Sequence, residues 1–551
     1  MFRDEWDTIT EEAARQKDDV VKQQEEAREG DILKPSTPLG LKLPPKFAEW
    51  REHQLLSVMR VHGSSKDCFL LDAPTGSGKS VTAAAVQRLS KEKELYLCTT
   101  KLLQEQLLAD FPYARTLFGR SNYPCAKAPH LFPSVSADSC TMDKLSNCSL
   151  SHRCPYMIAK RKALDADLAV LNMSYFLHEA NYAGSFCGYN TVVIDEADTV
   201  EGQLMNFVEL VVTKKQLDRL GIPPPRHKTK FESWVEWAHP TMAAASRELD
   251  SLEDAISSKD DWSTINFEDL KRMSQLKRLA SKLRFFVKNV DNTWVWYPEE
   301  ERWSFKPVWV SKYSDNSLWK HGKKFVCMSA TILDPVQMDR NVGITLSGKT
   351  RDYHQLPSLF PKENRPIYYR PEANMTFKTM NIALPMLVKG VNSLLEEYPK
   401  DKVLIHAVSY NVREYLMKNL SARSRLISHN TQDRVEKLEQ FKKSSQPLVL
   451  ISPSMDRGVD LPEDQCRVII IAKVPYPSLG DPQVKKRVYA SKDGNAWYAY
   501  HTIASIVQMA GRGVRSKTDW ASTYILDEQF GRLFDDYKNM FPGWFLEALV
   551  F

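Results

Sequence analysis

The sequence predicts an α/β protein of several domains whose central sheets are largely parallel. The chain has 551 residues, which is too long for one hydrophobic core. A buried-strand pattern at residues 68–73 runs directly into a glycine-rich loop and then a helix, and such units build parallel sheets. A second β-branched run at 191–194 ends in a cluster of acids, where parallel sheets carry their sites.

Composition and charge narrow the functional classes. Hydrophobic residues make up 43% and charged residues 26% of the chain, an ordinary balance for a soluble protein. No uncharged apolar run reaches the ~18 residues of a membrane span, and the N-terminus lacks the apolar core of a secretory signal. We expect a cytoplasmic, nucleoid-associated or nuclear protein without a membrane partner. The net charge of +6 suits a polyanionic partner but equally an ordinary solvated surface.

The strongest motif is a phosphate-binding loop between strand and helix. Its residues are Pro74, Thr75, Gly76, Ser77, Gly78, Lys79 and Ser80. Glycines let backbone N–H groups turn towards phosphate oxygens, at a helix N-terminus that favours anions. We expect Lys79 to reach the β- and γ-phosphates of ATP and Ser80 to ligate Mg²⁺. Ala73 replaces the first glycine of the general pattern, but the flanking strand and helix argue against a chance match.

Two acids behind the second strand would complete the nucleotide site. Asp195 can hold the Mg²⁺, and Glu196 can polarise the attacking water. Acidic runs such as Asp195-Glu196-Ala197-Asp198 are common by chance. Behind a buried strand and downstream of a phosphate loop, this one predicts ATP hydrolysis.

A polar motif near the C-terminus indicates a second half of the site. Gln508, Arg512 and Arg515 are spaced four and three apart, so they would share one face of a helix. Two such arginines can clamp phosphate charge from across a cleft. The alternative is a basic, solvated helix face. A further motif, Ser329-Ala330-Thr331, follows the apolar run 325–328.

Together these motifs resemble those of the XPD/DinG family of superfamily 2 helicases. The resemblance covers roughly residues 45–535, with the motifs in family order. Further matches are Arg51-Glu52-His53-Gln54, Thr99-Thr100-Lys101 with Gln104 and Gln106, 167–172, Gly458-Val459-Asp460-Leu461-Pro462, Val474-Pro475-Tyr476-Pro477 and Asp481-Pro482. It implies two RecA-like motor domains that bind ATP between them. Gln54 would read adenine, Asp460 would lie at the nucleotide, and the Thr100 motif would touch the DNA backbone.

Cysteine placement indicates a metal centre. The chain has nine cysteines, an odd number, and no secretion signal, so a disulfide framework is not expected. Four lie in apolar strand-like segments and should be inert core residues: Cys68, Cys98, Cys327 and Cys466. The other four cysteines all lie inside one stretch of 30 residues that is rich in Pro, Ser and Asn: Cys125, Cys140, Cys148 and Cys154.

Thiolates at this spacing could hold zinc or a 4Fe-4S cluster, and the spacing alone does not choose between them. The resemblance implies the 4Fe-4S cluster. The cysteines lie between the Thr100 motif and the acidic box, and the last one begins Cys154-Pro155-Tyr156, as in the family.

The resemblance also implies a division into domains. The segments are a charged N-terminal arm and linker (1–44), a first motor domain (45–111, 156–200 and 290–339), an iron–sulfur domain (112–155), an arch-like helical insertion (201–289) and a second motor domain (340–551). The arch contains an amphipathic stretch of Leu270, Met273, Leu276, Leu279, Leu283 and Phe286 with basic neighbours. It could be a packed helix or a DNA contact. Trp294, Trp296, Trp303 and Phe305 predict a hairpin whose rings more commonly pack than stack on bases.

Some positions depart from the family pattern. Asp198 replaces the usual His, Met455-Asp456-Arg457 replaces the usual Trp-Glu, and Asp527-Glu528-Gln529-Phe530 lacks the usual Arg. None of these removes a residue needed for hydrolysis.

The expected function is that of an ATP-dependent, DNA-stimulated helicase using ATP, Mg²⁺ and a 4Fe-4S cluster. It would move 5′ to 3′ on single-stranded DNA and separate forked or tailed duplexes at a wedge near the iron–sulfur domain. The alternative is a nucleic-acid-stimulated ATPase that remodels or translocates without unwinding. A binding module with a vestigial ATPase is disfavoured by the complete set of lysine, acids and arginines.

Overall fold

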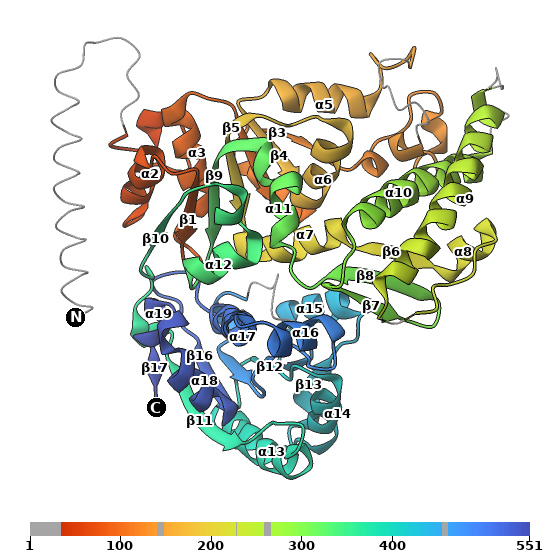
Figure 1. Cartoon of the computed structure of the whole chain (residues 1–551). Coiled ribbons are helices and arrows are strands. Elements are labelled where there is room, and N and C mark those ends of the chain that lie inside the picture. Colours follow the sequence, from red (N-terminus) through yellow and green to blue (C-terminus); the bar gives the residue numbers. More distant parts are fainter. Residues whose placement is uncertain (1–34, 140–147, 228, 258–265, 455–460) are drawn as a thin grey trace.

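A computed structural model describes residues 35–139, 148–227, 229–257, 266–454 and 461–551. Two seven-stranded sheets form its centre, and every strand pairing within each of them is parallel. Helices cover both sheets, one domain above the other in Figure 1. The predicted α/β class with two parallel-sheet domains is confirmed.

The first sheet has the strand order β10-β1-β9-β5-β2-β4-β3. Its strands are β1 (Cys68–Asp72), β2 (Glu94–Cys98), β3 (Arg115–Leu117), β4 (Leu168–Asn172), β5 (Tyr189–Asp195), β9 (Gly322–Ser329) and β10 (Arg351–Gln355). Alternate side chains of these strands pack into two hydrophobic cores, one on each face of the sheet. Leu70 packs on one face, and Phe69 and Leu71 pack on the other. Burial on both faces explains why these strands are continuously apolar in sequence.

The helices of this domain are α2 (Gln54–Gly63), α3 (Lys79–Ser90), α4 (Lys101–Asp110), α5 (Pro155–Asp165), α6 (Met173–His178), α7 (Val200–Val208), α11 (Ser311–Ser317) and α12 (Pro335–Val342). Several expected borders need adjustment, because residues 201–208 of the expected insertion belong to α7 of this domain and the hairpin 294–307 pairs with the insertion. Strand β10 pairs with β1, and Leu356 N–H donates to the Asp72 carbonyl, so the first domain reaches past the expected border at residue 340. Leu41 and Leu43, placed in the N-terminal linker, are buried in its core. Residues 1–34 of that arm lie outside the described residues.

The insertion forms a helical pair and a small antiparallel sheet. Its elements are β6 (Leu210–Thr213), α8 (Lys214–Leu220), α9 (Phe231–Ser257), α10 (Phe267–Asn289), β7 (Trp294–Pro298) and β8 (Arg302–Pro307). All six apolar positions predicted on the α10 stripe are buried, and Arg272 pairs with Glu248 across the two helices at 2.7 Å. The predicted hairpin is confirmed, and its three Trp rings and Phe305 are buried. Packing is therefore their use.

The second domain has the strand order β13-β14-β12-β15-β16-β11-β17. Its strands are β11 (Ile367–Ala373), β12 (Val403–His406), β13 (Leu426–Ser428), β14 (Val449–Ser452), β15 (Val468–Ile471), β16 (Ser522–Asp527) and β17 (Leu549–Val550). Its helices are α13 (Met380–Glu397), α14 (Tyr410–Asn419), α15 (Arg434–Lys443), α16 (Pro482–Ala490), α17 (Gly494–Ala510), α18 (Gln529–Tyr537) and α19 (Gly543–Leu546). Helices α16 and α17 lie on the side that faces the first domain (Figure 1). Among the described residues, no helix is both long and apolar enough to cross a bilayer.

Candidate nucleotide site between the two domains

Sheet order brings three sequence motifs together. Strand β9 lies between β1 and β5, so the phosphate loop, the Ser329 motif and the acidic box leave adjacent strand ends. Asp72 is level with Ser329, and Asp195 is level with Met328. The Ala73 N–H donates to the Ser329 carbonyl at 2.8 Å. The carboxyl edge of a parallel sheet is the usual place for a ligand site.

The phosphate loop has the backbone its glycines permit. Gly76 and Gly78 have φ of 85° and 83°, in the left-handed region that glycine adopts without steric cost. Helix α3 begins directly afterwards, and Lys79 Nζ donates to the Ala73 carbonyl at 3.2 Å. The Ser77 hydroxyl is buried with no hydrogen-bond partner in the described protein. A buried hydroxyl of this kind suits a ligand oxygen, so the loop fits a bound phosphate.

The acidic box begins with a buried carboxylate. Tyr96 Oη donates to Asp195 Oδ2 at 3.0 Å, and the Glu196 N–H donates to Asp195 Oδ1 at 3.0 Å. Burial raises the pKa of Asp195, against the opposing effects of the Lys79 charge and the Tyr96 bond. A divalent cation favours the charged form of such a group. Sequence reasoning missed Tyr96, whose one signal was a hydroxyl between the apolar residues Leu95 and Leu97 of a strand.

The next residue adopts an unusual backbone conformation. Glu196 has a φ of 51°, in the left-handed region, which costs a non-glycine residue of the order of 1–2 kcal/mol. The N–H and hydroxyl of Thr199 both donate to its carbonyl, at 2.9 and 2.8 Å. These bonds hold a turn that the backbone alone would not favour, between β5 and α7.

Hydrogen bonds connect this edge to the second domain. Ser329 Oγ donates to Asp198 Oδ1 at 2.7 Å. Gln508 Nε2 donates to Thr331 Oγ1 at 2.9 Å and to Asp198 Oδ2 at 3.5 Å, and Arg512 Nη2 donates to Gln508 Oε1 at 3.4 Å. Asp198, the departure from the family pattern, thus accepts hydrogen bonds from both the Ser329 motif and the Gln508 motif.

The two arginines do not share a helical face with Gln508, so that part of the prediction is wrong. Helix α17 ends at Ala510, Arg512 lies in the turn that follows it, and Arg515 lies in the irregular segment after that turn. Glycines on both sides of Arg512 disfavour helix continuation. Arg515 Nη1 donates to the Gly511 and Val514 carbonyls at 2.9 and 3.1 Å, so local carbonyls hold it at the helix end.

Two further residues lie against the phosphate loop. Gln54 is buried and donates from Nε2 to the Gly78 carbonyl at 2.9 Å, while its Oε1 accepts from the Arg51 N–H at 3.0 Å. Its role in reading adenine stays a prediction. The ring of Phe360 lies 2.6 Å from where a Cβ on Gly76 would stand. No sequence signal predicted Phe360, which reaches the loop from the segment between the domains.

The motif after β2 has mainly structural contacts. Thr100 caps α4 by accepting from the Leu103 N–H. Asn172 caps α6 and donates to the Thr99 carbonyl at 2.8 Å. Gln104 is buried and donates to Thr116 Oγ1 at 2.9 Å. A buried side chain cannot touch a DNA backbone, so the structure corrects that expectation for Gln104.

The structure describes eight of the nine cysteines. Cys68, Cys98, Cys327 and Cys466 are buried, and burial raises the pKa of Cys327 and of Cys466 to about 12, as expected of inert core thiols. Cys125, Cys148 and Cys154 are half-buried. Cys140 and the nucleotide-site candidate Asp460 lie outside the described residues. Within the described ranges, no three His, Cys, Asp or Glu side chains come together as a metal site.

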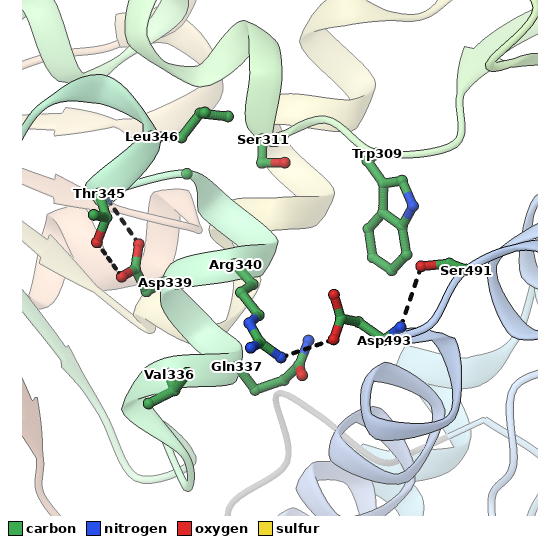
Figure 2. A pocket seen from close by; sticks show the side chains of 11 residues that line it. Trp309, Ser311, Val336, Gln337, Asp339, Arg340, Thr345, Leu346, Ser491 and Asp493 are labelled. Atoms are coloured by element: carbon green, nitrogen blue, oxygen red, sulfur yellow. Dashed lines mark hydrogen bonds and ion pairs between the residues drawn. The ribbon is translucent and has the colours of Figure 1, made fainter.

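A separate cavity of about 470 Å³ opens where the two domains meet. Figure 2 shows that it lies between α12 and the loop that carries Ser491 and Asp493. It shares no lining residue with the phosphate loop or acidic box. The exposed ion pair of Arg340 and Asp493, at 2.9 Å, bridges the domains there.

Comparison with known proteins agrees with this arrangement. Residues 51–230 match the DEAD/DEAH box helicase family, and residues 391–548 match the helicase C-terminal domain. The Fanconi anemia group J protein homolog of Gallus gallus is 26% identical over 99 residues, which cover 16% of this chain and 8% of that protein. The ATP-dependent DNA helicase CHL1 of Saccharomyces cerevisiae (strain YJM789) is 22% identical over 230 residues, 35% of this chain and 26% of that protein.

The matched segments therefore cover about a quarter or less of these relatives' length. A solved XPD helicase has the same fold, with a TM-score of 0.60 and 18% identity over 89% of this chain and 98% of that one.

Proposed function

We propose, from the premise that this chain belongs to the XPD/DinG-like family of superfamily 2 helicases, that it is an ATP-dependent DNA helicase. One observation carries the proposal. Gln508 of the second domain donates hydrogen bonds to Asp198 of the acidic box and to Thr331 of the Ser329 motif, and these bonds link the two domains beside the phosphate loop. A site divided between two domains can convert nucleotide hydrolysis into domain movement.

Each nucleotide contact is assigned to a residue. Lys79 contacts the β- and γ-phosphates, Ser80 and Asp195 hold Mg²⁺, and Glu196 orients water. The loop residues Thr75, Gly76, Ser77 and Gly78 cradle phosphate, with Gln54 and Asp460 at the nucleotide. Gln508, Arg512 and Arg515 approach from the second domain. The observed bond between Arg512 and Gln508 supports their acting as one unit.

Opening and closing of the two domains would move the protein along one DNA strand. Backbone contacts would dominate its grip, so binding should weaken with salt and depend little on sequence. We place this activity in the cytoplasm or nucleus, in DNA repair or replication. An ATPase that translocates without unwinding would use the same residues, and the two differ in whether a duplex separates.

We further propose that Cys125, Cys140, Cys148 and Cys154 hold a 4Fe-4S cluster. Four thiolates are the donor set that such clusters use. The three described cysteines are half-buried outside helices and strands, and Cys154 directly precedes α5. A bound cluster would cross-link this loop segment. Arg278 of α10 forms an ion pair with Asp138 of the same segment at 3.0 Å, so the helical insertion contacts the cysteine-containing segment.

Protein purified without oxygen should be brown and absorb broadly near ~400 nm, as cysteine-ligated iron does. Cys154→Ser should bleach it and lower its iron content because one ligand is lost. Cys187→Ser, which changes an exposed cysteine outside the set, should leave colour and iron unchanged. A colourless preparation with one stoichiometric zinc would contradict the cluster.

We propose 5′ to 3′ movement, with duplex separating at a wedge near the iron–sulfur segment. The family resemblance supports this polarity, because a wedge ahead of a motor works only when the motor drives the fork against it. Partial duplexes with a single-stranded 5′ tail should unwind, and those with a 3′ tail should not. Unwinding of the 3′-tailed substrate alone would overturn the polarity.

A further inference from the structure

A buried charge cluster joins the two domains away from the phosphate loop. Arg487 of α16 lies against Glu201 of α7, with Nη1 and Oε1 2.5 Å apart, and their side chains are 3% and 8% exposed. Arg487 Nε also donates to the Val308 carbonyl at 2.6 Å. Its guanidinium lies 4.7 Å from the ring centroid of Trp309 and 4.4 Å from that of Trp497.

Helix α17 completes the cluster from the second domain. Trp497 Nε1 donates to Glu201 Oε2 at 3.2 Å, and His501 Nε2 lies 2.9 Å from the same oxygen. Burial alone would raise the pKa of Glu201, but the charge of Arg487 and the contact with His501 outweigh it and hold the pKa at about 2. Glu201 therefore stays charged, and its partners come from the other domain.

Such a cluster tolerates little change in geometry. Two charges removed from water are compensated only when their hydrogen bonds are well aligned. Two indole rings next to the guanidinium add cation–π attraction in a desolvated place. Separation of the domains here would break the ion pair and both contacts that Glu201 makes with helix α17. The cluster should therefore remain assembled while other contacts between the domains change.

The nucleotide-site contacts lie close along the chain to the same two helices, Asp198 just before α7 and Gln508 near the end of α17. Glu201 follows Asp198 by three residues, and His501 precedes Gln508 by seven, two turns along α17. At that end, Gln508 Nε2 donates across the interface to Thr331 Oγ1 at 2.9 Å and to Asp198 Oδ2 at 3.5 Å. One end of this interface is thus a buried ion pair, and the other is joined by hydrogen bonds from the neutral amide of Gln508.

Helix α16 also binds the insertion through its own side chains. Gln483 Nε2 donates to the Pro307 carbonyl and Lys486 Nζ to the Asn292 carbonyl, both at 2.6 Å. Tyr297 Oη donates to Asp481 Oδ1 at 2.8 Å. Because β7 directly follows α10, a movement of α16 would be transmitted to the helical insertion.

We propose that Arg487 and Glu201 are positioning residues for the ATPase: they form the fulcrum about which the second domain turns to deliver Gln508 and Arg512 to the nucleotide. This rests on the proposed ATP-driven function. The fulcrum acts through α17, and neither residue contacts the phosphate loop. Loss of the pair should impair the turnover step more than nucleotide binding.

The test compares DNA-stimulated ATP hydrolysis of Arg487→Met, Arg487→Lys, Glu201→Gln and the double variant Glu201→Gln/Arg487→Met. Arg487→Met should lower kcat at least about tenfold, with KM for ATP within about threefold, since only closure is affected. The double variant should be no worse than either single one, because no buried charge is left unpaired. Arg487→Lys should restore part of kcat because it returns the charge.

Arg340→Ala is the matched control. It removes an ion pair across the same interface, which Figure 2 shows. The two side chains are 54% and 53% exposed, so the variant should leave kcat unchanged. The fulcrum is refuted if the kcat of Arg487→Met is as high as that of Arg340→Ala. It is also refuted if kcat, ATP affinity and melting temperature fall together in all four variants, because the pair would then serve stability alone. A wild-type chain without DNA-stimulated hydrolysis would instead refute the proposed function.

Discussion

Replacing Lys79 with alanine should lower DNA-stimulated ATP hydrolysis by at least about 100- to 1000-fold, because the developing phosphate charge loses its fixed cation. The fold should survive. Lys79 bonds only to the Ala73 carbonyl among the contacts described, and α3 would gain a good helix former. Steady-state phosphate release, with and without single-stranded DNA, measures the loss.

Lys66→Ala supplies the control for this experiment. Lys66 is exposed and precedes β1, at the strand end opposite the phosphate loop. The Lys66→Ala variant should hydrolyse ATP at the wild-type rate. Both variants should bind single-stranded DNA normally in a fluorescence anisotropy titration. Near-normal hydrolysis by Lys79→Ala would show that the phosphate loop is wrongly assigned.

Replacing Glu196 with glutamine should lower kcat by about 100-fold or more and leave ATP affinity nearly unchanged. General-base groups contribute about 10²–10⁴-fold to turnover, whereas Mg²⁺ would still have Asp195. Glutamine keeps the shape of the side chain, so the left-handed turn held by Thr199 should persist. Single-turnover hydrolysis and nucleotide-binding titration separate the two quantities.

Glu92→Gln changes an exposed carboxylate at the far end of the first domain and should have no effect on either quantity. The assignment of Glu196 fails if its variant retains wild-type turnover. It fails equally if turnover is normal once ATP is saturating, because the residue would then serve binding alone.

Much of this site was readable in the sequence because its parts are local. The phosphate loop needs a strand, two glycines and a helix start, and all of these lie within residues 68–90. The apolar stripe of α10 and the aromatic hairpin follow from periodicity, and both are as predicted. Hydrophobic periodicity and turn residues act over a few positions, so they can be interpreted without knowledge of the fold.

Features set by tertiary contacts could not be read in this way. The pairing of β10 with β1 joins segments almost 300 residues apart, and no local pattern encodes it. Gln104 looked available to DNA, yet burial against Thr116 removes it from the surface. Spacing placed Arg512 on a helical face, but the helix ends at Ala510, before this residue. Glu201 and Arg487 are ordinary charged residues until the fold buries them together.

Strand separation tests the central claim most directly. A duplex with a single-stranded 5′ tail, labelled on the displaced strand, is mixed with the protein and ATP, and a parallel reaction follows displacement of streptavidin from biotinylated single-stranded DNA. A helicase should release both the labelled strand and the streptavidin. Neither should be released by the Lys79→Ala variant, or by the wild-type protein with a non-hydrolysable ATP analogue. Streptavidin displacement with every tailed duplex left intact would contradict a helicase and identify a translocase.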